Sequence, residues 1–222
     1  IHGLPEIHSD NHSINWSSPN HIAISSAAKA TDGVVIAIDM TMRPTKDVLF
    51  HGRNGFISMG DGLPSGYYSL TNLLPTGGTI TVGNDSYTAV GGRIWLDHQW
   101  GDWTWAGYNW DWFSLRFDDG GALMLFQFRN NAGKVVPGNW TYRDGDGNLT
   151  YGTEYELRAH RRYHSYPIDW SIKIPDIEGA LKVSPLFDNQ TFIGLWEGLC
   201  VVTGKIGDSR MSGAAFVELN GY

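Results

Sequence analysis

The side chains best suited to acid–base chemistry lie in residues 92–117, which hold six of the ten tryptophans of this 222-residue chain. Within this segment Asp97 and His98 stand between Trp95 and Trp100. A carboxyl group surrounded by indoles is poorly solvated, so its charged form is disfavoured and it can hold a proton near neutral pH. Such a group could protonate an olefin or activate a carbonyl. The structural alternative is that Asp97 and His98 bond to the backbone at a strand end and fix a turn.

The period of a strand decides which of these side chains share a face. Successive side chains point to opposite faces, so Trp95 and Asp97 lie on one face and His98 and Trp100 on the other. We therefore expect Asp97 and His98 to point to different sides of the strand. One of them should face a cavity lined by indoles, and the other should pack between layers.

One pair of histidines, His160 and His164, has the spacing of two metal ligands on a helix. The flanking sequence is typical of a strand, where residues four apart are about 13 Å from each other, too far to share one ion. The chain also lacks a Gly-x-Ser-x-Gly motif and a glycine-rich phosphate loop. We therefore expect no metal and no cofactor, and we disfavour a conventional hydrolase.

The elements that must position these residues are short strands. The chain has 28 glycines and 13% aromatic but only 18% charged residues, a composition that favours strands joined by glycine turns. Aspartate and glycine tolerate positive φ, so residues 118–121 and 144–147 predict hairpin turns. The one weak helix candidate is 25–30, and 64–74 is typical of a loop. Strands are expected at 34–42, 78–82, 87–95, 110–117, 122–129, 140–143, 150–163, 169–174, 180–183, 194–203 and 211–219.

The distribution of strands predicts an all-β fold of two consecutive antiparallel domains. Residues 67–222 contain nine or ten short strands, enough to close one calycin-type barrel of roughly eight strands. The stretch 1–59 contains only three or four, too few to close a barrel. We therefore expect residues 1–66 to be the C-terminal part of a first domain, incomplete in this chain and completed by a missing N-terminal segment.

Charge and hydropathy limit the possible partners. The formal charge of −7 argues against nucleic acid and against an anionic membrane surface. No run of 18 apolar residues exists, so we expect no transmembrane segment. A cavity lined by tryptophan instead favours a hydrophobic small molecule as the partner.

Asparagine sequons indicate the compartment. Six Asn-X-Ser/Thr sequences occur, whereas 13 asparagines in this composition would produce about two by chance. Any one of them could be accidental, but six together favour a secreted or secretory-lumen glycoprotein with the sites on loops or solvent-facing strand positions. The expected glycosylation sites are Asn11, Asn15, Asn84, Asn139, Asn148 and Asn189.

Three blocks of sequence carry a family resemblance. Tyr67-Tyr68-Ser69, the decapeptide GRIWLDHQWG at 92–101, and the C-terminal Trp196-Glu197-Gly198 with VELNGY at 217–222 are similar to signatures of the carotenoid-1,2-hydratase-like (AttH-type) family. The resemblance covers 67–222. It implies two consecutive lipocalin-like domains with a pocket between them, in a family whose members are usually longer at the N-terminus.

The resemblance also implies roles for particular residues. Asp97 matches the catalytic aspartate of the carotenoid hydratases, and Trp95 matches an aromatic residue that lines their pocket. We expect His98 and Tyr68 to complete the catalytic set by hydrogen bonding to a substrate carbonyl or hydroxyl. The expected substrate-binding residues are Trp95, Trp100, Trp105, Trp196 and His51.

Two classes of function remain open, an enzyme and a non-catalytic carrier of a hydrophobic ligand. Known chemistry in the family that the chain resembles includes hydration of isoprenoid double bonds, hydration of prenylated phenolics, and Diels–Alder or hetero-Diels–Alder cyclisation. Since glycosylation is more typical of its fungal pathway enzymes, we rank cyclisation of a hydrophobic polyketide or terpenoid first and hydration second. Cyclisation requires mainly shape and one hydrogen-bond donor, whereas hydration requires a true acid.

Overall fold

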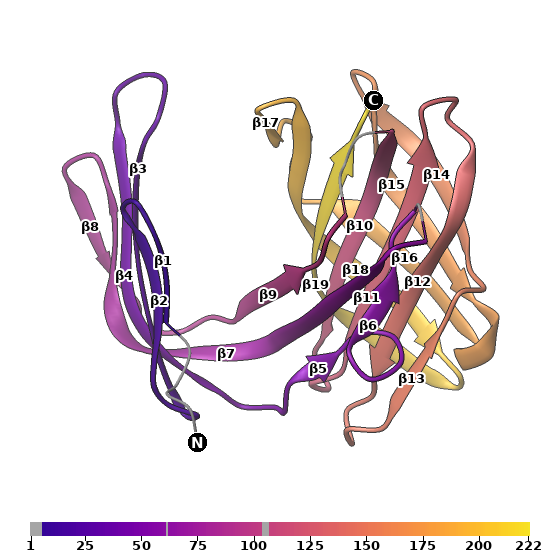
Figure 1. Cartoon of the computed structure of the whole chain (residues 1–222), viewed down its shortest axis with the longest axis horizontal. Helices are drawn as coiled ribbons and strands as arrows, with labels where there is room; N and C mark the ends of the chain where they lie inside the picture. The colour runs from indigo at the N-terminus through magenta and orange to yellow at the C-terminus, as the bar shows by residue number, and fades with distance from the viewer. Residues whose placement is uncertain (1–5, 61, 104–106) are drawn as a thin grey trace. The chain divides into compact units, whose positions relative to one another are not determined.

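The protein is built almost entirely of antiparallel strands (Figure 1). A computed structural model describes residues 6–60, 62–103 and 107–222. The described residues form two compact units: unit 1 is drawn from Ile1–Val48 and Leu70–Asp97, and unit 2 from Leu49–Ser69 and His98–Tyr222. Among these residues no helix combines the length and apolarity needed to cross a membrane.

Unit 1 is a sheet with strand order β1-β2-β3-β4-β7, in which β8 also pairs with β7. Its core consists of Ile22, Met42, Leu70 and Leu73, against which Ile94 and Leu96 of β9 pack. Its strands are β1 (Glu6–Ser9), β2 (His12–Ser18), β3 (His21–Lys29), β4 (Val35–Pro44), part of β7 (Pro64–Val82), β8 (Asp85–Thr88) and part of β9 (Ile94–Trp100).

Two expectations about local structure are wrong in this part of the chain. The helix candidate 25–30 lies mostly in β3, where Ala27 is the direct partner of Ala37 in β4. Six residues are too few to stabilise a helix against such a ladder. The loop expected at 64–74 belongs to the 19-residue strand β7. Of the two prolines in β7, Pro64 is tolerated because it is the first residue of the strand, and Pro75 lies opposite Met42 at a register shift.

Unit 2 contains a ten-stranded sheet that is strongly curled (Figure 1), and its apolar side chains form a core. Its strand order is β13-β12-β11-β10-β19-β18-β16-β15-β14, and β17 pairs with β18. The strands are β10 (Tyr108–Phe117), β11 (Ala122–Asn130), β12 (Val135–Arg143), β13 (Leu149–Gly152), β14 (Glu156–Tyr163), β15 (Tyr166–Ile174), β16 (Gly179–Pro185), β17 (Thr191–Phe192), β18 (Leu195–Ile206) and β19 (Ser209–Asn220), with one 3-10 turn at Pro175–Ile177.

The turns of unit 2 follow local chemistry. In the 118–121 hairpin Gly120 has a φ of 89°, and in the 144–147 hairpin Gly147 has a φ of 100°, so both predicted turns are confirmed. Two expected strands are each interrupted. The strand expected at 150–163 divides into β13 and β14, and the one expected at 87–95 ends in β8 and resumes in β9.

The sheet of unit 2 is covered on its outer face as well as on its inner face. Residues 49–69, which include β5 (Leu49–Phe50) and β6 (Phe56–Ser58), lie against β10, β11 and β12. The backbone N–H of Gly52 donates to Thr141 Oγ1 at 3.0 Å, and the Trp112 indole donates to the Tyr67 hydroxyl at 3.0 Å. Segment 49–69 therefore belongs to unit 2.

The observed division of the chain is interleaved and differs from the single boundary expected after residue 66. The reason is that β7 runs without a break through both units, which meet in sequence between Ser69 and Leu70. Strand β9 is divided in the same way, between Asp97 and His98. Completion of the first domain by a segment outside this chain stays a prediction.

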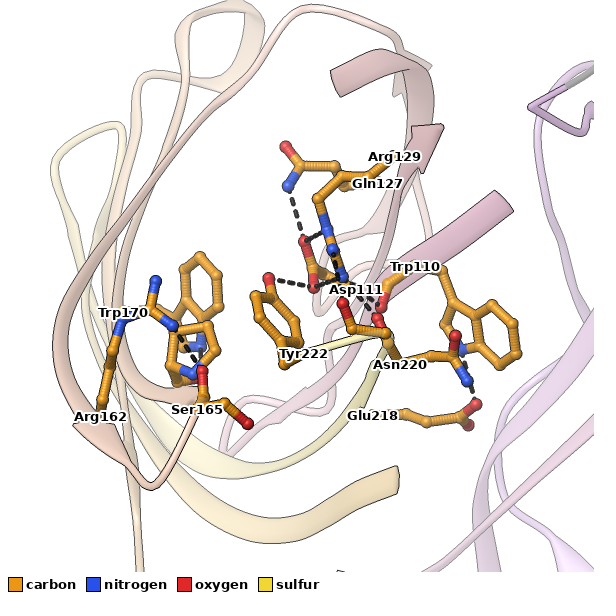
Figure 2. A network of polar contacts seen from close by, with 12 residues as sticks. Trp110, Asp111, Gln127, Arg129, Arg162, Ser165, Trp170, Glu218, Asn220 and Tyr222 are labelled. Carbon is orange, nitrogen blue, oxygen red and sulfur yellow. Dashed lines mark hydrogen bonds and ion pairs between the residues drawn. The ribbon is translucent and has the colours of Figure 1, made fainter. Parts of the chain in front are cut away.

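A buried polar network joins Tyr222 to β10 and β11 (Figure 2). Asp111 is fully buried and accepts hydrogen bonds from Arg129 Nη2 at 3.0 Å, Gln127 Nε2 at 2.7 Å and the Tyr222 hydroxyl at 2.7 Å. The Arg129 guanidinium lies 4.0 Å from the centre of the Tyr222 ring and also donates to the Asn220 carbonyl at 2.6 Å. A buried charge pair with this many hydrogen-bond partners stabilises the fold and is not free to react with a ligand.

The first prediction concerns this network. Asp111→Ala should lower the free energy of unfolding by about 3–5 kcal/mol, because it leaves the Arg129 charge buried without its partner. Tyr222→Phe should lower it by about 1.5–3 kcal/mol, the usual value for a hydrogen bond to a charged group. Chemical denaturation measures both changes. The matched control is Tyr151→Phe, which removes a hydroxyl from a half-exposed ring. Equal losses in all three variants would contradict the prediction.

Candidate functional site

Four aromatic side chains of unit 2 form the candidate site, called the aromatic cluster below: Phe50, Tyr68, His98 and Trp100. Tyr68 comes from β7, and its hydroxyl is 3.1 Å from His98 Nδ1 on β9. The ring centres of His98 and Trp100 are 4.9 Å apart, and those of Tyr68 and Trp100 are 6.0 Å apart. Phe50 stands edge-on to Tyr68 at 6.2 Å. The structure thus brings together three residues that the sequence analysis selected.

The local sequence of β7 makes room for this arrangement. A Cβ atom at Gly66 would overlap the indole of Trp100, so only glycine lets that ring lie against the strand. The Ser65 hydroxyl donates to the Trp100 carbonyl at 3.1 Å and fixes the end of β9. Trp100 remains 47% exposed and Tyr68 is half-buried. The aromatic cluster therefore combines an apolar wall with access from solvent.

The Tyr68–His98 pair can carry protons. Burial raises the pKa of Tyr68, so its phenol is neutral and a hydrogen-bond donor at physiological pH. An imidazole accepts or donates at Nδ1 according to its tautomer, and histidine is the side chain most often used as a general acid or base. A phenol bonded to an imidazole therefore offers a donor and an acceptor at one place.

A second hydrogen-bonded pair, His51 and Ser69, lies on the opposite face of β7 from Tyr68. His51 is completely buried, and its Nε2 lies 2.6 Å from the Ser69 hydroxyl. Its ring centre is 4.2 Å from that of Tyr67. Burial lowers the pKa of His51 to about 3, so the ring is neutral. We expected His51 to contact substrate, but the structure places it in the interior of unit 2, where it supports β7.

Asp97 and Trp95 lie in unit 1 and share one face of β9, as strand alternation predicted. The Trp95 indole donates to Asp97 Oδ1 at 2.8 Å. His98 contacts Trp100, two residues away, as Asp97 contacts Trp95, which confirms that the two neighbours point to different sides. Asp97 is an exposed residue of β9. Its role as a general acid stays a prediction.

One of the other tryptophans expected in the pocket wall, Trp196, is not part of the aromatic cluster. Trp196 is fully buried in the core of unit 2, and its indole donates to the Asp188 carbonyl at 2.8 Å. It therefore packs the core in this structure and does not present a surface to a ligand. Trp105 lies outside the described residues.

The sequence analysis did not identify Phe50 as a site residue. Phe50 lies in the two-residue strand β5, which has no periodic pattern to mark it. It lines a pocket of about 400 Å³ in unit 2, together with residues of β12 and β13. The elements that form this pocket are far apart in the sequence, and no local signal could have joined them.

Comparison with known proteins places the chain among relatives. A family model described as AttH-like matches residues 5–222. The dehydratase AsqC of Emericella nidulans is 24% identical over 205 residues, which are 83% of this chain and 58% of that protein. The chain thus spans little more than half the length of this curated relative.

Two solved structures share the fold. One is a Nitrosomonas europaea protein assigned as AttH, with a TM-score of 0.82 and 24% identity. The other is kievitone hydratase from Nectria haematococca, with a TM-score of 0.79 and 20% identity. Each match covers 98% of this chain and 70% of the other. The all-β, lipocalin-like fold expected from the sequence is therefore confirmed, as is the resemblance to the AttH-type family.

The second prediction concerns the neutral state of His51. In the unfolded chain its pKa is about 6.5, so between pH 6.5 and about 3 the unfolded state binds a proton that the folded state excludes. The free energy of unfolding should therefore fall as pH falls below 6.5, by up to about 1.4 kcal/mol per pH unit from this residue alone.

NMR of the histidine rings provides the direct measurement. The His51 signals should not titrate between pH 5 and 8 in the folded protein. His51→Gln should reduce the loss of stability between pH 6.5 and 5 relative to that of the wild type. A His51 midpoint near 6.5 would contradict the burial that positions Tyr67 and Ser69.

Proposed function

The chain belongs to the AttH-like family, and from this premise we propose that the protein is an enzyme that adds water to, or removes water from, a hydrophobic small molecule at the aromatic cluster. The observation that carries the proposal is the hydrogen-bonded Tyr68–His98 pair, which lies against the half-exposed indole of Trp100. Apolar walls with a few placed polar groups are the usual composition of small-molecule sites.

The relatives favour water chemistry over the cyclisation that the sequence analysis ranked first. Both relatives with a stated reaction, AsqC and kievitone hydratase, add or remove water. A proton-transfer pair is what such reactions require, whereas a cyclisation depends mainly on substrate shape. Hydration or dehydration therefore replaces cyclisation as the proposed reaction, and a non-catalytic carrier remains the alternative from another class.

The chemistry follows from the two groups. In dehydration, one group protonates the leaving hydroxyl as the carbon–oxygen bond breaks, and the other removes a proton from the adjacent carbon. Hydration is the reverse, with water losing a proton as it attacks. Because Tyr68 and His98 share a hydrogen bond, the proton gained by one can return to the other after each turnover. Asp97, which the resemblance marks as the catalytic acid, is a second candidate.

The third prediction tests the reaction and the pair together. Tyr68→Phe and His98→Gln should each lower turnover by about 10²–10⁴-fold, the usual contribution of general acid–base catalysis, and leave the unfolding midpoint unchanged. Turnover is measured on prenylated phenols and their hydrated forms in ¹⁸O-labelled water, where hydration adds one labelled oxygen and cyclisation leaves the mass of the substrate unchanged.

Matched controls separate the possible outcomes. Tyr87→Phe and His160→Gln change the same residue types at exposed positions outside the aromatic cluster and should keep full turnover. If Asp97→Asn abolishes turnover while Tyr68→Phe and His98→Gln retain it, the reaction does not take place at the Tyr68–His98 pair. Ligand binding with no labelled product in any variant would support a carrier.

We also propose that the protein is a glycoprotein of the secretory pathway. The burial of one sequon asparagine changes the expected set of glycosylation sites. Asn139 is only 8% exposed, and both polar atoms of its amide are enclosed, so it cannot accept a glycan in the folded protein and we withdraw it. The remaining sequon asparagines are half-buried (Asn15) or exposed (Asn11, Asn84, Asn148 and Asn189).

The fourth prediction follows from this difference in exposure. In a eukaryotic secretory host, Asn84→Gln and Asn189→Gln should each remove the mass of one glycan. Asn139→Gln should leave the glycan mass unchanged. Intact mass before and after endoglycosidase treatment measures all three, and an unchanged wild-type mass after treatment would contradict the proposal.

A further inference from the structure

The pocket beside Phe50 has the size and lining of a ligand site. Its volume of about 400 Å³ lies within the range of small-molecule pockets. It is built wholly within unit 2, between the chain that follows β5 and the β12–β13 hairpin. Its lining residues are Phe50, Gly52, Asn54, Thr141, Leu149 and Tyr151.

The walls of this pocket are apolar side chains that are about half exposed to solvent. Phe50, Leu149 and Tyr151 are 50%, 51% and 48% exposed. A ligand that covers these three side chains binds more tightly, because each Å² of apolar surface removed from water contributes about 25 cal/mol of favourable binding free energy. Two of the three are aromatic, and aromatic rings stack on flat partners. The lining therefore favours a planar apolar ring.

The rim of the pocket is rigid. Gly52 has a φ of 60°, and a Cβ atom there would overlap the Phe56 carbonyl. Its N–H is bonded to the buried hydroxyl of Thr141, which is the direct cross-strand partner of Tyr151. The N–H of Phe56 donates to the Arg53 carbonyl and closes the turn. A preformed rim reduces the conformational entropy lost on binding.

One polar group on the rim is available to a ligand. Asn54 is exposed, has a φ of 59°, and its amide has no hydrogen-bond partner among the described residues. An amide both donates and accepts, so it can pair with a hydroxyl on the ring of a ligand.

Phe50 links the pocket to the aromatic cluster, because the same ring lines the pocket and contacts Tyr68. We propose that this pocket binds a planar aromatic ring that carries a hydroxyl, as part of a phenolic substrate whose reacting carbons lie at Tyr68 and His98. This inference rests on the proposed function, since it names the class of substrate for that site.

The fifth prediction uses 2-naphthol as the probe and isothermal titration calorimetry as the measurement. Tyr151→Ala and Leu149→Ala should each weaken 2-naphthol binding about tenfold, because each removes one apolar wall. Asn54→Gly, which retains the left-handed backbone, should weaken 2-naphthol but leave the affinity for naphthalene unchanged. Decahydro-2-naphthol, which is not planar, should bind more weakly than 2-naphthol.

Controls distinguish this inference from the proposed reaction. Phe192→Ala removes an apolar side chain of similar exposure, 59%, from β17 of the same unit and should not change binding. Tyr68→Phe should lower turnover as predicted above but keep its affinity for 2-naphthol. Absent 2-naphthol binding, or binding that both Tyr151→Ala and Leu149→Ala retain in full, would overturn the pocket. An unchanged kcat/KM for the prenylated phenol in Tyr151→Ala would overturn the assignment of the pocket to the substrate.

Discussion

The need to bury both faces of β10, β11 and β12 organises unit 2. Their inner side chains, such as Phe113 and Leu125, enter the core of the curled sheet. On β11 the outer side chains Met124, Phe126 and Phe128 are apolar and buried as well. A strand that is apolar on both faces must be covered on both faces. Residues 49–69 supply the outer cover, and this cover holds the rest of the candidate site.

The alternation of side chains along β7 places the residues that hold the strand on one face and the candidate site residue Tyr68 on the other. Tyr67 and Ser69 face inward, where they meet Trp112 and the neutral ring of His51. Tyr68, between them, faces the other way and meets His98. A strand held firmly on one face presents its other face in a fixed orientation, which is the preorganisation that a proton-transfer pair requires. The packing of Tyr67 and Ser69 against the rest of unit 2 therefore also fixes the orientation of Tyr68 in the candidate site.

Unit 2 contains two polar groups of interest, the network around Asp111 and the Tyr68–His98 pair, and their surroundings indicate different roles. Asp111 is fully buried and meets arginine, glutamine and tyrosine partners, an arrangement that stabilises the fold. Tyr68 is half-buried, bonded to one imidazole and reachable from solvent. Ionisable groups with unusual surroundings mark functional sites only when a ligand can reach them. By that criterion the Tyr68–His98 pair is the better candidate, although the network around Asp111 contains more hydrogen bonds.

The sequence by itself determined the all-β class, the two hairpin turns and the opposite orientation of Asp97 and His98, because each follows from residues close in the chain. It did not determine which aromatic side chains meet. Whether an asparagine, a histidine or a tryptophan is buried depends on which distant segment covers it, so Asn139, His51 and Trp196 were placed only by tertiary structure. The same holds for Phe50 and its pocket. Local chemistry sets the direction of a side chain, but packing between segments far apart in sequence decides its neighbours.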